Sequence, residues 1–446
     1  MPDAKPGPRP DTDEQPPTHE QPEPAVRVAR GGFTFLLIVG ATFGVQFLIL
    51  VSGVISARVL GVEGRGVVAL ATAIATFAAQ LSFGGSLPPA ITKLLAERRV
   101  GARDGFGAVA RRRGWLLVLP ALVAGALVPV LHRDAGVEEQ VVTALVVLVI
   151  TLQTILFLVL AGGLQGEGRL VRMAWVALAP QAAFVIALTV ALAADWSWGA
   201  TQVLLAYVAS NALGLVLSWF ALLRREGGRP IEEAALWTET RRNYVSGVRP
   251  LDGLGIERLL VGGVLGTSAL GLFAAGAAVS NLCRLVSTAI SVVVLPQVAQ
   301  HHDDPAEQRA VVRRWTGVTF VLVVLIVSGL ELVAEPIIRL AFGDEFLGAV
   351  ACARWLILAD GLLAVRRVFI SVLQGQGRGG VASWVELALL PVLVGGIVAA
   401  SLDDSLTGVG ITLAAVGGLS CVALGWAVAR GPRTPKLKTS AGRHRA

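Results

Sequence analysis

Apolar residues occur in long runs along this chain, and short polar stretches separate the runs. Within the runs, apolar and polar positions do not alternate with the period of two that membrane-barrel strands need. In hydrocarbon every backbone amide must be hydrogen-bonded within its own segment, so runs of about 20 apolar residues predict membrane-spanning helices. We expect an all-α integral membrane protein with about twelve transmembrane helices, at residues 33–55, 66–92, 114–131, 140–162, 173–194, 202–223, 244–265, 270–299, 315–334, 349–373, 380–400 and 408–429.

The polar stretches divide the chain into five parts. Residues 1–32 begin with a stretch rich in Pro, Asp and Glu and are expected to form a disordered cytosolic tail. No signal peptide is expected, because the first apolar run begins at Phe33 and is long enough to span. The remaining parts are a six-helix bundle, a cytosolic linker, a second six-helix bundle and a basic cytosolic tail, at residues 33–223, 224–243, 244–430 and 431–446.

Composition and charge agree with a membrane protein. Of 446 residues 54% are apolar and 15% are charged, and the mean hydropathy is +0.69. The net charge of +7 does not indicate nucleic-acid binding, because the basic residues lie in short loops between apolar runs. The predicted inner segments hold most of them, which predicts cytosolic N and C termini. The predicted outer loops hold only Arg58, Arg65, Arg133 and Arg339.

The chain also repeats itself. Val59-Leu60-Gly61 with Gly66 recurs as Val264-Leu265-Gly266 with Gly271, at an offset of 205 residues. The segment 164–169, Leu-Gln-Gly-Glu-Gly-Arg, recurs as Leu-Gln-Gly-Gln-Gly-Arg at 373–378, and Trp175-Val176 recurs as Trp384-Val385. Because six predicted helices separate the copies, both halves enter the membrane in the same direction, and a substrate path is expected between them.

These segments carry a family resemblance. The stretch 57–61 with Gly66, the stretch 270–276, Val294-Leu295-Pro296 and the two Leu-Gln-Gly-x-Gly-Arg turns resemble the MATE/MOP superfamily, and within it the Wzx-type oligosaccharide flippases of polysaccharide biosynthesis. The resemblance implies two six-helix bundles around a V-shaped cavity that opens alternately to either side of the bacterial cytoplasmic membrane. The implied cargo is a glycan linked to a lipid pyrophosphate, with undecaprenyl pyrophosphate as the expected carrier. Peptidoglycan lipid II flippases typically have fourteen helices, so twelve favours the oligosaccharide branch.

Ionisable side chains at membrane depth cost at least ~2.5 kcal/mol each on insertion scales, which makes them functional candidates. Arg284 lies near the middle of the predicted helix 270–299, where a cation suits the cargo pyrophosphate. The alternative is a structural salt bridge between Arg284 and a carboxylate of the preceding helix.

The predicted helix 244–265 carries Arg249, Asp252, Glu257 and Arg258 around Pro250. Arg249 and Asp252 are three residues apart and can pair on one face. Charge on a helix broken by Pro and Gly is typical of a midplane binding site, so the two arginines are candidates for the cavity. Asp252 and Glu257 are candidates for a coupling proton or sodium ion. An internal ion network that holds this helix to the next one explains the same residues.

Four further charged residues lie in the predicted helix 349–373. Asp360 is a third ion-coupling candidate and shares a face with Arg367, seven residues later. Arg367 is a cavity candidate, although Arg366 and Arg367 are also near enough to the inner loop to reach lipid headgroups. Arg354 can form an outer gate or snorkel to the surface. On the first predicted helix, Gln46 can contact sugar hydroxyls or bond its helix neighbours.

Three functions remain open from the residues. The first is a flippase for the lipid-linked glycan, with the bilayer and a polysaccharide polymerase as further partners. The second is a cation-coupled multidrug exporter of the same fold, but the excess of arginines in the second half favours an anionic cargo. The third is a membrane glycosyltransferase or polymerase, which the short outer loops disfavour. We therefore expect a transporter rather than an enzyme, with no cofactor and no metal.

Overall fold

The structure is a computed structural model that describes residues 28–98, 115–133, 135–222, 232–247, 250–251, 253–284, 290, 294, 298, 305–376 and 378–430. Regular secondary structure within these ranges is helical throughout. Eight described segments are long and apolar enough to cross a membrane. Apolar side chains also cover the outside, as at Leu332 and Leu340, which are 82% and 80% exposed. A surface of this kind faces lipid, so the predicted all-α membrane fold is confirmed.

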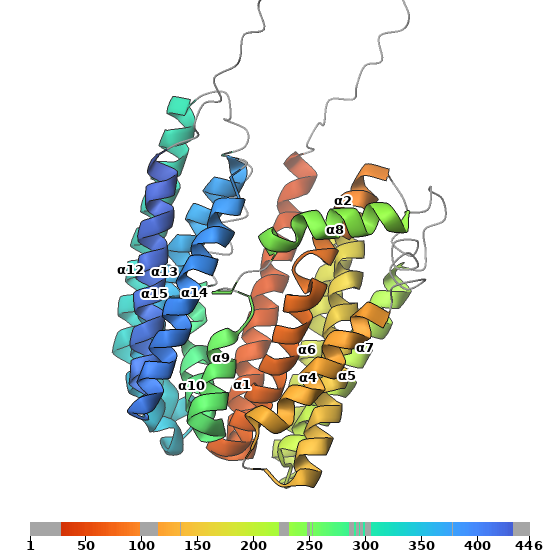
Figure 1. The fold of residues 1–446 in the computed structure, drawn as a ribbon, viewed down its shortest axis with the longest axis vertical. Helices are drawn as coiled ribbons and strands as arrows, with labels where there is room; N and C mark the ends of the chain where they lie inside the picture. The colour runs from red at the N-terminus through yellow and green to blue at the C-terminus, as the bar shows by residue number, and fades with distance from the viewer. Residues whose placement is uncertain are drawn as a thin grey trace, which may run out of the picture.

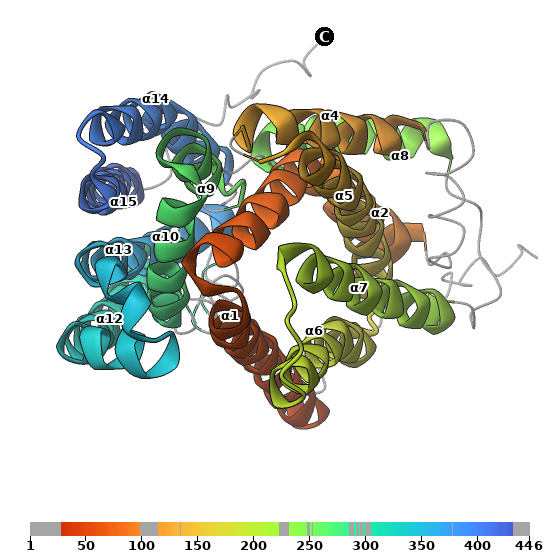
Figure 2. The same ribbon diagram turned by 90° about the horizontal axis from the view of Figure 1, so that it is seen from below.

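The helices form two groups, which meet at α1 of the first group and α10 of the second (Figures 1 and 2). The first group consists of α1 (Val28–Ala79), η1 (Gln80–Gly84), α2 (Leu87–Arg98), α4 (Trp115–Leu131), α5 (Val137–Gly166), α6 (Leu170–Ala193) and α7 (Ala200–Leu222). After α8 (Glu233–Gly247), the second group consists of α9 (Ile256–Leu260), η2 (Val261–Leu265), α10 (Gly266–Ser280), α12 (Pro305–Ala341), η3 (Asp344–Ala349), α13 (Val350–Gly375), α14 (Gly380–Leu402) and α15 (Leu406–Ala429).

Two glycines divide the longest apolar segments. Gly61 interrupts α1 with φ 66° and ψ −170°, and Gly266 separates η2 from α10 with φ 85° and ψ 174°. Both conformations lie in the left-handed region, which favours glycine because it has no Cβ. We count α1 as two segments, divided at Gly61, and we count η2 and α10 as two more, divided at Gly266. Counted in this way, the described residues hold the twelve predicted apolar helices. The repeated Val-Leu-Gly triplet thus marks one kink in each half; we call the end of the molecule that holds both kinks the kink end.

The two kinked segments cross with their backbones in contact. A methyl group on Gly66 would overlap the carbonyl oxygen of Thr267, and one on Gly271 would overlap the carbonyl oxygen of Val62. The offset of 205 residues relates Gly66 to Gly271 and also Val62 to Thr267. The contact is therefore reciprocal, as a pseudo-twofold axis between the halves requires.

Two further pairs of turns show the same symmetry. The Arg169 amide donates to Leu164 O at 2.9 Å, and the Arg378 amide donates to Leu373 O at 2.7 Å. Each of these arginines also donates from Nη1 to a carbonyl near the end of the last helix of its half. Asp195 and Asp404, an equivalent pair that the sequence did not single out, are the described non-glycine residues with positive φ, at 49° and 47°.

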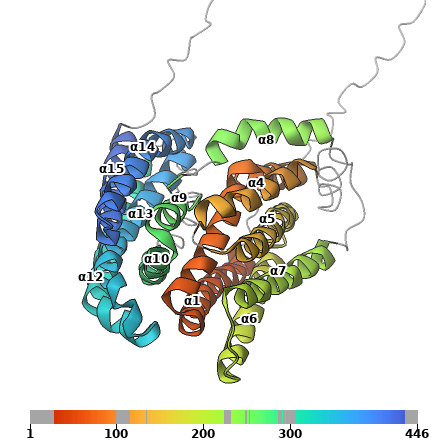
Figure 3. The same cartoon turned by 60° about the horizontal axis from the view of Figure 1, so that its bottom comes forward.

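The link between the halves differs from the prediction. Helix α8 occupies much of the predicted polar linker and runs across the direction of the other helices (Figures 1 and 3). It is fixed to the first half by an ion pair of 2.7 Å between Lys93 and Glu239. The predicted helix 244–265 is wrong at its start, because α8 ends at Gly247 and α9 begins only at Ile256. Pro250 lies in the intervening turn, where its ring cannot continue a helix. Residues 28–32 of the predicted N-terminal tail belong to α1, and the rest of that tail and the C-terminal tail lie outside the described residues.

Candidate substrate site between the two halves

A cavity of about 100 Å³ lies between the halves, and we call it the arginine cavity. Both limbs of α1 line it on one side, and α9 and α10 with the residues that follow α10 line it on the other. Its polar lining consists of Gln46, Arg65, Thr72, Arg258 and Asn281, and the other lining side chains are apolar. Since no carboxylate is among the lining residues, the cavity carries positive charge and offers amide and hydroxyl groups beside it.

Arg65 reaches the cavity from the returning limb of α1. The prediction that placed Arg65 in an outer loop is wrong, because the helix continues through Gly61 and carries the side chain inward. A Cβ at position 53 would lie 3.3 Å from Nη2 of Arg65, so Gly53 leaves the space that the guanidinium occupies. Nε of Arg65 is buried and has no hydrogen-bond partner among the described residues. An unpartnered buried donor costs free energy until a ligand or water accepts from it.

Arg258 reaches the same cavity from α9 in the second half. Two guanidinium groups that share one cavity repel each other, and a bound anion offsets that repulsion. Within the described residues neither Arg65 nor Arg258 has a carboxylate at ion-pair distance. Bidentate bonding to phosphate oxygens is the chemistry that paired guanidinium groups perform best. Gln46 and Arg258, two of the predicted cavity residues, are thus brought together with the unpredicted Arg65.

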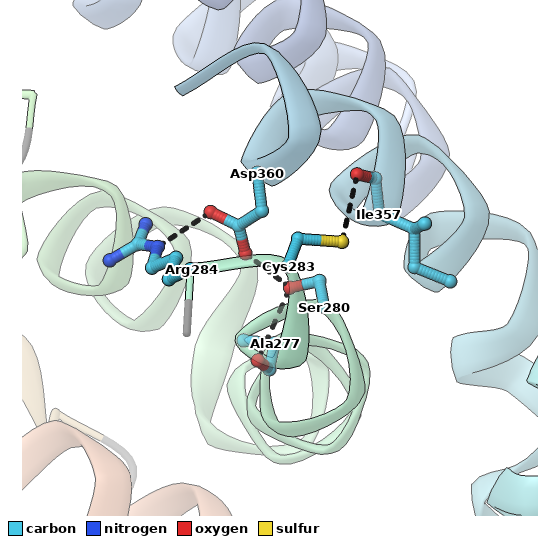
Figure 4. Close-up of polar contacts among 6 residues, drawn as sticks. All are labelled: Ala277, Ser280, Cys283, Arg284, Ile357 and Asp360. Carbon is cyan, nitrogen blue, oxygen red and sulfur yellow. Dashed lines mark hydrogen bonds and ion pairs between the residues drawn. The ribbon is translucent and has the colours of Figure 1, made fainter. Parts of the chain in front are cut away.

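Arg284 is paired with Asp360, a carboxylate of α13. Its Nε donates to Oδ1 of Asp360 at 2.8 Å, and Ser280 Oγ donates to Oδ2 at 2.6 Å (Figure 4). The side chains of Arg284 and Asp360 are 31% and 9% exposed. The pair joins the end of α10 to α13, so an ion-coupling candidate and the strongest cargo candidate neutralise each other.

A second ion pair is completely buried inside the second half. Arg366 of α13 pairs with Glu386 of α14, and both residues are 0% exposed. Oε2 of Glu386 also accepts the amide of Leu251 at 3.3 Å, which ties the turn before α9 to α14. The prediction that Arg366 reaches the headgroups is wrong, because its guanidinium points into the bundle. Glu386 was missed, although a single acid inside a long apolar run was the signal that could have found it.

The other candidates lie outside the arginine cavity or outside the described residues. Arg354 is exposed, and its Nε lies 4.0 Å from Oε2 of Glu331 on α12. Arg367 and Glu257 are partly buried on α13 and α9. Arg249 and Asp252 lie outside the described residues. Roles for these five residues in cargo binding or ion coupling remain predictions.

This architecture is the multi-pass membrane fold that solved structures of MATE/MOP transporters share. The chain superposes on an inward-facing MATE family multidrug transporter with a TM-score of 0.67 and 16% identity, over 86% of this chain and 94% of that one. It superposes on the lipid II flippase MurJ in an inward closed conformation with a TM-score of 0.69 and 14% identity, over 88% of this chain and 87% of that one. The resemblance predicted from the sequence is confirmed.

The sequence gives a closer relationship in part of the chain. Residues 253–351 match the family described as "Polysaccharide biosynthesis protein". The chain is 30% identical over 177 residues to the succinoglycan biosynthesis transport protein ExoT of Rhizobium meliloti (strain 1021), a match that covers 39% of this chain and 35% of ExoT. The chain therefore spans about a third of the length of that relative. The proteins that it resembles are transporters and flippases rather than enzymes.

Proposed function

We propose that this protein moves a lipid-pyrophosphate-linked oligosaccharide from the inner to the outer leaflet by alternating access. The observation that carries the proposal is the pair Arg65 and Arg258, one from each half, facing a single cavity whose lining has no carboxylate. A pyrophosphate cannot enter hydrocarbon without compensating charge, and two guanidinium groups supply it. Gln46 and Asn281 beside them suit the hydroxyl groups of the first sugars.

The contact between the halves supports a conformation that loads cargo from the cytosolic side. The crossing at Gly66 and Gly271 closes the kink end, whereas the cavity extends from there along α1 as far as Gln46. With both termini in the cytosol, as the distribution of basic residues predicts, the kink end faces outward and the cavity belongs to the cytosolic side. The TM-score is 0.67 with the inward-facing MATE structure and 0.53 with the outward-facing one.

The relatives support the class of cargo. ExoT is a transport protein of succinoglycan biosynthesis, and MurJ flips lipid II. We extend this to a cargo carried on undecaprenyl pyrophosphate in the bacterial cytoplasmic membrane, delivered to a polysaccharide polymerase. Asp252, Glu257 and Asp360 remain the candidates for ion coupling. Asp360 then acts through its pairing with Arg284, which a cargo phosphate competes for.

The test locates the lipid-linked glycan in cells that lack this protein, with a labelling reagent that cannot cross the membrane. Cells complemented with the wild-type chain should show labelled glycan outside, and cells with Arg258→Gln should retain it inside. Arg314→Gln, the same substitution on an exposed residue of α12, is the matched control. Normal outside labelling in depleted cells, with a second flippase excluded, would refute the proposal and turn attention to the multidrug-exporter alternative.

A further inference from the structure

A second cavity, larger than the one between the arginines, lies among the described residues. A pocket of about 660 Å³ lies at the kink end, and we call it the kink pocket. It is formed by the kink of α1, the loop between α4 and α5, the loop between α6 and α7, and the start of α10. Three of these elements belong to the first half and one to the second, so its shape depends on how the halves meet.

The kink pocket and the arginine cavity share no lining residue and lie against the same crossing of α1 and α10. Thr267, whose carbonyl meets Gly66, lines the kink pocket. Glu63 lines the kink pocket whereas Arg65 lines the arginine cavity, because residues two apart on a helix point in different directions. One turn of α1 thus presents an acid to one compartment and a base to the other.

The chemistry of the kink pocket is the reverse of that of the arginine cavity. Glu63 and Glu139 supply carboxylate acceptors, Thr267 and Ser268 supply hydroxyl groups, and no Lys or Arg is among the residues that line it. Trp198 contributes an indole ring, held by stacking on Trp196 with ring centroids 5.9 Å apart. Carboxylates and hydroxyl groups around a flat aromatic face suit a neutral sugar, whose hydroxyls donate and accept while its C–H face stacks on the ring.

One ring nitrogen of a buried histidine in this pocket lacks a hydrogen-bond partner among the described residues. His132 is 7% exposed, and its Nε2 has no hydrogen-bond partner among the described residues. Oε1 of Glu139 lies 3.7 Å from that nitrogen, which is beyond hydrogen-bond distance. A buried nitrogen left this way costs free energy, and a hydroxyl group bound between His132 and Glu139 would satisfy both side chains.

We infer that the kink pocket is a second carbohydrate site, which binds neutral hexose units on the far side of the closed crossing. The inference rests on the proposed function, in which a glycan leaves from this end. Glu63, Glu139 and His132 bond sugar hydroxyls, and Trp198 stacks on one sugar ring. Because the pocket excludes a pyrophosphate by its negative charge, it holds the sugar part of the cargo while the arginine cavity holds the phosphate part.

The test is saturation-transfer NMR on the purified full-length protein in nanodiscs, with glucose, mannose and N-acetylglucosamine as separate probes. Sugar signals are expected with the wild-type protein and should fall roughly three- to tenfold with Trp198→Ala, the loss expected for one aromatic contact. Glu63→Gln should weaken them as well. Trp175→Ala removes a tryptophan that is 63% exposed on α6, away from the pocket, and should change nothing.

Other results would overturn the inference. The first is that the wild-type protein gives no saturation transfer to any of the sugars. The second is that Trp198→Ala leaves the transfer unchanged. The third is that ethanolamine displaces the sugars, which would indicate an amine site. Arg258→Gln separates this inference from the proposed function, because it should abolish outside labelling of the glycan and leave sugar binding at the kink pocket intact. If Arg258→Gln loses outside labelling but the wild-type protein binds no sugar, the inference about the kink pocket alone is refuted. If the wild-type protein binds sugar but Arg258→Gln shows normal labelling, the proposed flippase function alone is refuted.

Discussion

Gly66 and Gly271 are equivalent in the internal repeat and are also neighbours in space. A Cβ on Gly66 would lie 3.2 Å from the amide nitrogen of Gly271, and a Cβ on Gly271 would lie 3.3 Å from that of Gly66. Each would also overlap a carbonyl oxygen of the opposite segment. The symmetry axis between the halves therefore passes through a contact of two backbones, which only glycine permits at both positions.

Gly66→Ala should prevent the kink end from closing. A methyl group forced against backbone costs about 1–3 kcal/mol, which lowers the ratio of closed to open protein roughly 5- to 150-fold. Spin labels on Arg133→Cys and Asp344→Cys, exposed residues of opposite halves, should report longer distances in the Gly66→Ala background. Gly329→Ala is the control, because nothing lies within 4 Å of a Cβ there. Unchanged distances would show that the crossing does not set the closed state.

Removing either member of the buried Arg366–Glu386 pair should destabilise the protein strongly. Arg366→Ala or Glu386→Ala leaves one uncompensated charge at a site that is 0% exposed, and the expected cost is about 3–5 kcal/mol. The double variant Arg366→Met, Glu386→Leu removes both charges and should recover most of that loss. Thermal unfolding in detergent, followed by size-exclusion chromatography, measures all three. A double variant less stable than either single one would mean that the pair does more than neutralise charge.

The Arg284–Asp360 pair should behave as one unit. Arg284→Ala and Asp360→Ala each leave one member of a bond of 2.8 Å without its partner. A double-mutant cycle on thermal stability should therefore give a coupling energy of about 0.5–3 kcal/mol. Additive effects would place the two residues in separate roles. Glycan labelling in Arg284→Ala, compared at matched protein levels, then tells whether Arg284 also contacts cargo.

Arg65→Gln should reduce transport as Arg258→Gln does, although the two residues belong to different halves. Loss of a charged hydrogen bond to phosphate costs about 1.5–3 kcal/mol, or roughly 10- to 100-fold in affinity. Outside labelling of the glycan measures the effect, and fluorescence of a fused reporter verifies insertion. Wild-type labelling in Arg65→Gln would remove Arg65 from cargo binding.

The sequence predicted the architecture well because its signals are local or periodic. Apolar runs located most helices, and the offset of 205 residues paired Gly61 with Gly266, because a positive φ requires the same residue in each half. The kinks themselves were not predicted, since both glycines were placed in short loops between helices. The equivalent turns at Asp195 and Asp404 escaped notice because aspartate tolerates that conformation without a distinctive pattern around it.

The site was predicted only in part, because hydropathy does not reveal which side chains meet. A charge four residues beyond a glycine looked like a loop residue, so Arg65 was placed outside a helix that in fact continues. Partners distant in sequence were equally hidden: 76 residues separate Arg284 from Asp360, and 135 separate Leu251 from Glu386. Arg258 and Gln46 were found because an ionisable or amide group inside an apolar run is itself conspicuous.

The crossing of the two kinked segments also bears on how often the protein can cycle. Glycines meet there without side chains between them, so at the crossing itself the two backbones fit tightly. A deep, interdigitated closure would have to be unlocked against many van der Waals contacts at every turnover. A contact of bare backbone adds no interlocking side chains at the crossing to those that must separate when the halves part from that end.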